Sequence, residues 1–413
     1  MASGTTVTTA AATTTAATTT GAADRATAVL LNDADAPVVL TELATVTGAR
    51  IGIATLNVEK TLNSLSLPMI DILAPALTRW ATDDGIAMVW LQGAGERAFA
   101  AGGDIQALYA AMARNHAAGS AVDDYPPRFF ESEYRLDHQL HCFPKPVLAW
   151  GHGVVMGGGL GLFLAASHRV VTERTRLAMP EVTIGLFPDA GATWLLRHIE
   201  PALARWLALT GSQMNAADAC AIGLGQYHVP NAARATVLSA LQALSWTGDA
   251  DSNRALLHDV LVAHVTAVDN ATSQLLAHQP ALRRALTEPL ADGDAAMAAL
   301  ATLATLLPDD DYITRGVTAA RRGCPTSVGI IVEQSRRAPT LDLISCLRME
   351  LTVAWHCAAQ RDFAEGVRAL IVDKDNAPRW WTGDSAAART AHVASHFVDP
   401  WPAHPLADLA TGA

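Results

Sequence analysis

The alternation of short apolar segments with amphipathic ones, from residue 36 to about residue 229, constrains the fold of this 413-residue chain more than any other feature. Apolar runs of strand length are separated by stretches whose apolar residues recur at helical spacing, as in 66–84. Strands that alternate with helices predict an α/β core with layered packing. The segments with strand character, of which the first two are expected to form a β-hairpin, are 38–44, 50–57, 86–93, 146–153, 168–173 and 176–182.

Beyond Val229 almost every segment has helical character. The first 20 residues carry no charged side chain and lack the basic start and apolar run of a secretory signal. A transit peptide would need several arginines, and Arg25 is the first. We therefore predict a cytoplasmic protein, with the mitochondrial matrix left open. Its predicted regions are a disordered Ala/Thr-rich tail (1–35), an α/β core (36–235), a helical region (236–390) and a C-terminal tail (391–413).

Charge and composition exclude several kinds of partner. A net charge of −11 and a pI near 5.6 argue against a nucleic-acid surface. Residues 147–167 are uncharged and long enough to span a bilayer, but six glycines between 151 and 161 make a poor lipid-facing helix. We expect no membrane partner, and we expect His152 to be a packed residue. Five cysteines, an odd number without paired CxxC spacing, indicate a reducing compartment without disulfides or a zinc site.

The glycine-rich segment has several interpretations. Gly151, Gly153 and Gly157 miss the dinucleotide fingerprint by one residue, and no Walker loop is present. Alternatively, backbone N–H groups at Gly157–Gly159 and at Gly102–Gly103 could together form an oxyanion hole. Both segments could also be simple tight turns, with Asp104 as a helix cap.

Three motifs carry a family resemblance: "AFAAGGDI", "KPVLAWGHGVVMGGGLGL" and "AMPEVTIGLFPDAGATWLL". In order and separation they resemble the crotonase (enoyl-CoA hydratase/isomerase) superfamily, over roughly residues 45–381. The segments "FFESEYRL" and "DFAEGVRALIVDKDNAPRW" are similar to the branch that hydrolyses β-hydroxyacyl-CoA thioesters. The resemblance implies the α/β fold class of a crotonase-like spiral of β-β-α units with an α-helical C-terminal region.

The resemblance also implies roles for individual residues. The thioester oxygen would be held by the backbone N–H groups of Gly103 and Gly158, which form the oxyanion hole. Glu181 and Asp189 would be the catalytic and substrate-binding carboxylates, and Glu133 would contact the substrate. For Glu133 a solvated position on a helix surface is the alternative. Hydratases carry a second glutamate at the position of Gly161, which is the decisive departure of this chain.

The predicted reaction is therefore hydrolysis of a short β-hydroxyacyl-CoA, with 3-hydroxyisobutyryl-CoA as the expected substrate. Coenzyme A is part of that substrate, and no other cofactor and no metal are expected. The alternatives are a hydratase or isomerase of the same fold, a non-catalytic acyl-CoA-binding protein, and a dinucleotide-binding oxidoreductase. A homo-oligomer and a monomer both remain open.

Overall fold

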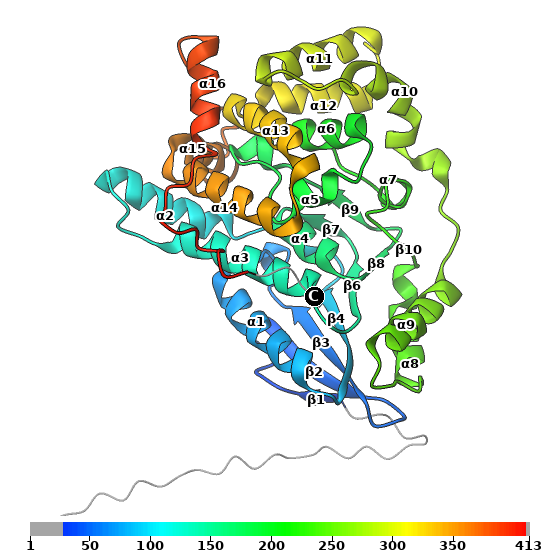
Figure 1. The fold of residues 1–413 in the computed structure, drawn as a ribbon. Coiled ribbons are helices and arrows are strands. Elements are labelled where there is room, and N and C mark those ends of the chain that lie inside the picture. The colour runs from blue at the N-terminus through cyan, green and yellow to red at the C-terminus, as the bar shows by residue number, and fades with distance from the viewer. Residues whose placement is uncertain (1–27, 410–413) are drawn as a thin grey trace, which may run out of the picture.

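The computed structural model describes residues 28–409 of the chain. Each turn of its core contributes one strand to a large sheet and the next strand to a small sheet, and then a helix or turn leads to the next repeat (Figure 1). This arrangement is the predicted spiral of β-β-α units. The large sheet has the spatial order β1 (Ala28–Leu30), β2 (Val38–Ala44), β3 (Arg50–Leu56), β4 (Ile86–Gly93), β6 (Val147–Gly151), β8 (His168–Val171) and β10 (Tyr227–His228).

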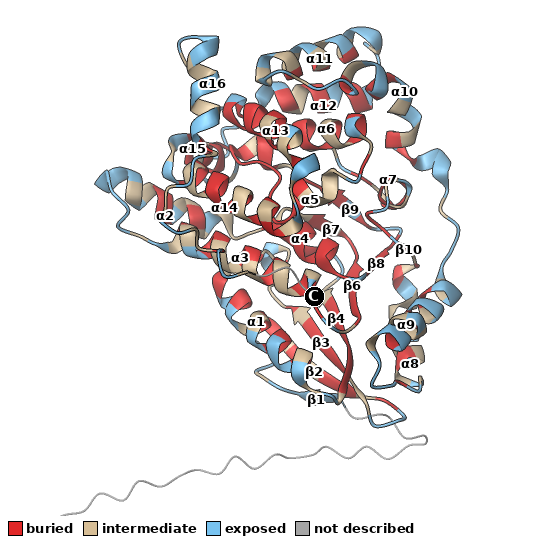
Figure 2. Ribbon diagram, in the orientation of Figure 1, coloured by how far each residue is buried: buried red, intermediate tan, exposed pale blue. Residues whose placement is uncertain are grey.

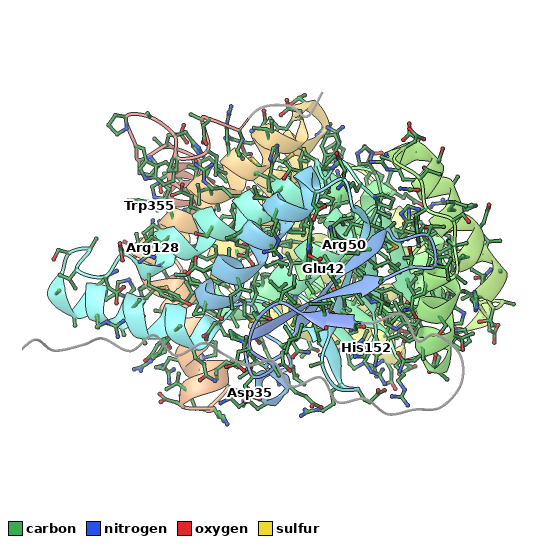
Figure 3. All side chains as sticks on the ribbon, turned by 90° about the horizontal axis from the view of Figure 1, so that it is seen from below. Asp35, Glu42, Arg50, Arg128, His152 and Trp355 are labelled. Atoms are coloured by element: carbon green, nitrogen blue, oxygen red, sulfur yellow. The ribbon has the colours of Figure 1, made fainter. Side chains whose placement is uncertain are left out.

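The small sheet contains β5 (Ala98–Ala100), β7 (Val154–Met156) and β9 (Arg176–Ala178), and its strands are parallel. In the large sheet only the pairs β1–β2 and β2–β3 are antiparallel. The predicted β-hairpin is thus confirmed as β2–β3. Glu42 of β2 links the hairpin to α1 (Leu67–Thr82): it accepts a hydrogen bond from Arg50 of β3 and one of 2.9 Å from the Trp80 indole of α1. Glu42 and Arg50 lie together in Figure 3.

Helices cover both faces of the large sheet (Figure 1). The main core lies beneath the helices that follow the strands, and its interior residues are seen in red in Figure 2. The helices of this part are α1 (Leu67–Thr82), α2 (Ile105–Ala118), α3 (Tyr125–His141), α4 (Gly158–Ala165), α5 (Ala192–Leu196), α6 (Pro201–Thr210) and α7 (Ala216–Ala221).

The opposite face of the sheet carries a second apolar cluster. Trp90 and Trp150 stack there with ring centroids 5.5 Å apart. Two helices, α8 (Arg234–Gln242) and α9 (Ala250–His264), cover this pair with buried side chains such as Leu241. The boundary predicted between residues 235 and 236 falls inside α8, and this helix packs with α9 on the second face of the sheet.

The remaining helices pack above the core and away from the large sheet (Figure 1). They confirm the predicted helical character of the C-terminal region. They are α10 (Gln274–Leu286), α11 (Gly293–Leu306), α12 (Asp311–Arg322), α13 (Pro325–Arg337), α14 (Leu343–Ala359), α15 (Arg361–Val367) and α16 (Ala386–Ser395), with a π-helix, η6 (Arg368–Val372), after α15.

Both predicted tails contain ordered structure. Strand β1 lies within the range 1–35 and pairs with β2, so part of that range belongs to the large sheet; residues 1–27 lie outside the described residues. At the other end, Leu406 is fully buried in the main core, and Arg135 of α3 donates hydrogen bonds to Pro405 and Asp408. The predicted C-terminal tail therefore begins inside α16 (Ala386–Ser395), and its residues 405–408 pack against α3, where Leu406 completes the core.

We expect Leu406→Ala to lower the free energy of unfolding by about 2–5 kcal/mol, since it would leave a cavity in a fully buried site. Val398→Ala is the matched control. Val398 lies in the same segment but is 62% exposed, so its loss should change stability by no more than about 0.5 kcal/mol. Urea unfolding of the full chain measures both. Equal effects of the two changes would contradict a packed C-terminal segment.

Candidate active site

Two glycine loops approach each other at the ends of neighbouring strands of the small sheet. Gly102 follows β5 and has φ +102°, and Gly157 follows β7 and has φ +50°. A Cβ atom on Gly157 would lie 3.2 Å from the Cα atom of Gly102. The two backbones are therefore in direct contact, and only glycine combines this backbone conformation with so close an approach.

The predicted oxyanion-hole residues lie directly after these contacts. Gly103 precedes α2, whose cap is Asp104, and no acceptor for the Gly103 N–H is found within residues 28–409. Gly158 is the first residue of α4, so its N–H has no intrahelical acceptor. A Cβ atom on Gly158 would lie 1.8 Å from Glu133 Oε1, and one on Gly103 would lie 2.9 Å from the Phe129 ring. Neither position has room for a side chain.

One cavity brings all five predicted site residues together. It encloses about 150 Å³, enough for a small acyl group, and its lining includes Gly103, Gly158, Glu133, Glu181 and Asp189. The rest of its wall is mainly apolar, with side chains from α3, η2 (Glu181–Ile184), α15 and η6. A larger cavity, of about 450 Å³ between α11, α13 and α16, contains none of these residues.

Glu181 begins the short 3₁₀ helix η2, three residues after the end of β9. Its side chain is only 4% exposed, and its Oε2 atom has no hydrogen-bond partner among the described residues. Burial and then the nearby charge of Asp189 raise the pKa of Glu181 well above its ordinary value. Such a carboxyl group binds protons strongly and is a candidate for proton transfer.

Asp189 lies in the turn that precedes α5. Its Oδ2 atom accepts a hydrogen bond of 2.6 Å from the hydroxyl of Tyr134 on α3. Burial raises the pKa of Asp189 to about 6, and the hydrogen bond from Tyr134 opposes that rise. Asp189 therefore changes protonation state close to neutral pH.

Glu133 is buried rather than solvated, with 2% exposure, so the surface alternative for this residue is wrong. Asp137 lies four residues further along α3, on the same face of the helix, and is fully buried. Burial, and then the charge of Asp189, raise the pKa of both groups well above the ordinary value. The sequence analysis missed Asp137, although its spacing from Glu133 could have indicated it.

The structure explains why Gly161 carries no carboxylate. A Cβ atom on Gly161 would lie 2.6 Å from the Ala190 Cβ and 2.9 Å from the Ala190 carbonyl oxygen. Asp137 Oδ1 would be 3.3 Å away on another side. The turn that supplies Asp189 thus occupies the space into which a side chain at position 161 would project.

Three further residues of the site were not predicted, although one of them, Tyr134, lies in the segment "FFESEYRL". Tyr134 donates a hydrogen bond to Asp189, while Gln334 of α13 and Glu350 of α14 form hydrogen bonds with the turn around Asp189. The partners lie 55 to 159 residues apart in the chain. Only the packing of the helices on one another brings these side chains together. As expected, His152 is a packed residue: it is fully buried, and its Nε2 atom lies 3.0 Å from the Gly95 carbonyl oxygen (Figure 3).

Residues 28–409 contain neither a metal-binding cluster nor a membrane-spanning helix. No group of three or more His, Cys, Asp or Glu side chains in that range is arranged to hold a metal ion. Nor does any helix in it have both the length and the apolar character to cross a membrane. The uncharged stretch that raised this question is divided among β6, β7 and the eight-residue helix α4.

The family model for enoyl-CoA hydratase/isomerase matches residues 51–397. The mitochondrial 3-hydroxyisobutyryl-CoA hydrolase of Gallus gallus is 32% identical over 353 residues, which cover 84% of this chain and 85% of that protein. The corresponding Homo sapiens protein is 31% identical, with 84% and 86% covered. Among solved structures, an enoyl-CoA hydratase from Rhodobacter sphaeroides 2.4.1 has a TM-score of 0.73 and 31% identity, over 88% of this chain and 98% of that one. A carnitinyl-CoA dehydratase from Mycobacterium thermoresistibile has a TM-score of 0.73 and 30% identity, over 88% and 97%.

We expect Tyr134→Phe to raise the pKa of Asp189 above about 6, because it removes the hydrogen bond that favours the ionised carboxylate. The titration of the ¹³C-labelled aspartate carboxyl carbons, followed by NMR, measures the change. Tyr125→Phe on the same helix is the control, since no hydrogen bond links Tyr125 to Asp189 within the described chain. An unchanged pKa of Asp189 in Tyr134→Phe would contradict the assigned hydrogen bond.

Proposed function

The chain belongs to the enoyl-CoA hydratase/isomerase family, and on that premise we propose that it hydrolyses 3-hydroxyisobutyryl-CoA to 3-hydroxyisobutyrate and coenzyme A. The relatives named as 3-hydroxyisobutyryl-CoA hydrolases support this substrate over most of the chain's length. One structural observation carries the choice of hydrolysis over hydration. The cavity holds Glu181 and Asp189, but the position of a second hydratase glutamate, Gly161, is filled by the Asp189 turn.

The backbone N–H groups of Gly103 and Gly158 would bind the thioester carbonyl oxygen. They belong to two loops that are in fixed contact, so the donors are positioned before the substrate arrives. Negative charge develops on that oxygen when the carbonyl carbon is attacked, and preorganised donors stabilise it. The positive end of the α4 dipole acts in the same direction.

Glu181 would activate the attack, and two routes satisfy the geometry. In the first, its carboxylate takes a proton from water, the resulting hydroxide attacks the carbonyl carbon, and the coenzyme A thiolate leaves and takes that proton. In the second, a Glu181 oxygen attacks and the thiolate leaves; water then opens the mixed anhydride, which releases the acid and restores the Glu181 carboxylate, and the remaining proton of the water goes to the thiolate. Both routes yield the same products and require Glu181 to be ionised first.

Asp189 and Glu133 would recognise the hydroxyl group of the substrate or orient the water. Both carboxyl groups are buried and line the cavity. A carboxyl oxygen without another hydrogen-bond partner can bind a hydroxyl group. Glu133 Oε1 is such an atom among the described residues. A buried polar group that pairs with a substrate hydroxyl discriminates strongly against an analogue without it.

Hydration of an enoyl-CoA is the second candidate. Solved structures named as an enoyl-CoA hydratase and a carnitinyl-CoA dehydratase, at 31% and 30% identity, favour it. Crotonyl-CoA hydration, measured beside thiol release from 3-hydroxyisobutyryl-CoA, separates the two activities.

We expect Glu181→Gln to reduce thiol release by roughly 10²- to 10⁴-fold, because the amide can neither accept a proton nor form an anhydride. A thiol reagent follows the free coenzyme A in the wild type and the variant. Glu131→Gln, a surface change on α3 that touches only an ion pair with Arg135, should leave the rate unchanged. Thiol release that survives in Glu181→Gln would remove Glu181 from the reaction. Rapid crotonyl-CoA hydration without thiol release would favour the hydratase instead.

As the pH is lowered, the rate should begin to fall at a higher pH than an ordinary glutamate would give. Only ionised Glu181 is active, and its pKa is raised by burial, so kcat/KM should decrease as the pH falls through that raised value. Asp189, with a pKa of about 6, contributes to the same decrease. A profile of kcat/KM between about pH 5 and pH 9 tests this expectation. A rate that stays constant down to the acid end of that range would contradict it.

A further inference from the structure

The turn that carries Asp189 has an unusual backbone. Ala190 has φ +54° and Gly191 has φ +85°, so two successive residues are left-handed, and the first of them is not glycine. A residue with a side chain adopts this conformation at a cost and keeps it only where its surroundings hold it in place. The contacts around the turn therefore determine where the carboxyl group of Asp189 lies.

Glu350 of α14 holds the C-terminal side of the turn. Its Oε2 atom accepts a 2.8 Å hydrogen bond from the Gly191 N–H, and its Oε1 atom accepts one of 2.9 Å from the Thr193 N–H. Helix α5 begins at Ala192, and no side chain of its own loop caps it. The Glu350 carboxyl group, 157 residues beyond Thr193, therefore accepts the hydrogen bonds of the N–H groups at the start of α5. Glu350 is fully buried.

Gln334 of α13 holds the other side of the turn. Its Nε2 atom donates hydrogen bonds of 2.6 Å to the Pro188 carbonyl oxygen and to Thr193 Oγ1. Gln334 and Thr193 are 4% and 1% exposed, so water does not compete for these bonds. Two helices of the C-terminal region thus fix the backbone immediately before and after Asp189.

Neither residue lines the cavity that holds Glu181 and Asp189. Asp189 lines that cavity, and its carboxyl group accepts a hydrogen bond from Tyr134. Glu350 and Gln334 form hydrogen bonds with the backbone on either side of Asp189. Any displacement of residues 188–193 would therefore move the carboxyl group relative to both Tyr134 and the substrate.

We propose that Gln334 and Glu350 are positioning residues, which hold Asp189 in its reactive place by fixing residues 188–193. This inference rests on the proposed hydrolysis. It makes α13 and α14 a necessary part of the active site, although they follow the core that contains every residue predicted for catalysis.

The test compares Glu350→Gln with the wild-type full chain. Glutamine has the shape of glutamate, but its amide NH₂ group would face one of the two backbone N–H groups that donate hydrogen bonds to the Glu350 carboxyl group. We expect kcat for thiol release to fall roughly 10- to 100-fold, since displacement of a reacting group by about 1 Å has effects of this size. Neither residue contacts the substrate, so KM should change only as far as the displaced Asp189 weakens its contact with the substrate hydroxyl. The acidic limb of the pH profile should shift to higher pH. The hydrogen bond from Tyr134 lowers the pKa of Asp189, so a longer bond would let that pKa rise.

Gln334→Met provides a second, uncharged variant that keeps the volume and loses both hydrogen bonds, and it carries the test if Glu350→Gln does not fold. The matched control is Glu333→Gln on α13, which should keep the wild-type kcat and pH profile. Within the described residues Glu333 forms ion pairs with Arg336 and Arg337, away from the Asp189 turn. Circular dichroism establishes that each variant is folded.

The inference is overturned if the folded variants keep the wild-type kcat, or if their melting temperature falls while kcat and the pH profile stay unchanged. A wild-type protein that releases no thiol from 3-hydroxyisobutyryl-CoA would instead overturn the proposed function, and this inference with it. The two failures are therefore distinguished by the activity of the wild type.

Discussion

The contact between Gly102 and Gly157 is the constraint on which the candidate site depends. Two loops can place their N–H groups around a single oxygen atom only if their backbones nearly touch, and any side chain at these positions would separate them. The parallel pairing of β5 with β7 brings the loops to the same edge of the small sheet. The helices α2 and α4 then begin at this edge, and Gly103 and Gly158 at their starts line the cavity.

The site also concentrates buried carboxyl groups to an unusual degree. Glu133, Asp137, Glu181, Asp189 and Glu350 are each at most 9% exposed, and no ion pair reaches any of them within the part of the chain that the structure describes. Burial of a charge without a partner is unfavourable, so these groups hold protons to higher pH than exposed carboxyl groups. For Glu350 the pKa is raised to about 8. Such an arrangement lowers stability, and carboxyl groups with raised pKa values that line a cavity are candidates for proton transfer near neutral pH.

The helical C-terminal region has two relations to the core. Helices α8 and α9 bury the second face of the large sheet and stabilise it. Helices α13 and α14 instead reach the turn at Asp189, and Phe363 of α15 lines the cavity itself. The carboxylates predicted from the core motifs therefore lie in surroundings that the core alone does not provide.

The sequence by itself determined the alternation of strands and helices and the two glycine loops, because periodicity and turn chemistry act between near neighbours in the chain. The strand predicted at 86–93 coincides with β4, for example. The five predicted site residues followed from the resemblance of its motifs to the crotonase superfamily. Only the tertiary structure decided which carboxyl groups share one buried environment. It alone showed that Glu133 is buried, that Ala190 fills the space beside Gly161, and that Glu350 reaches Gly191 across 159 residues. Burial and long-range hydrogen bonds depend on how helices pack, and local sequence does not encode which helix will lie beside which turn.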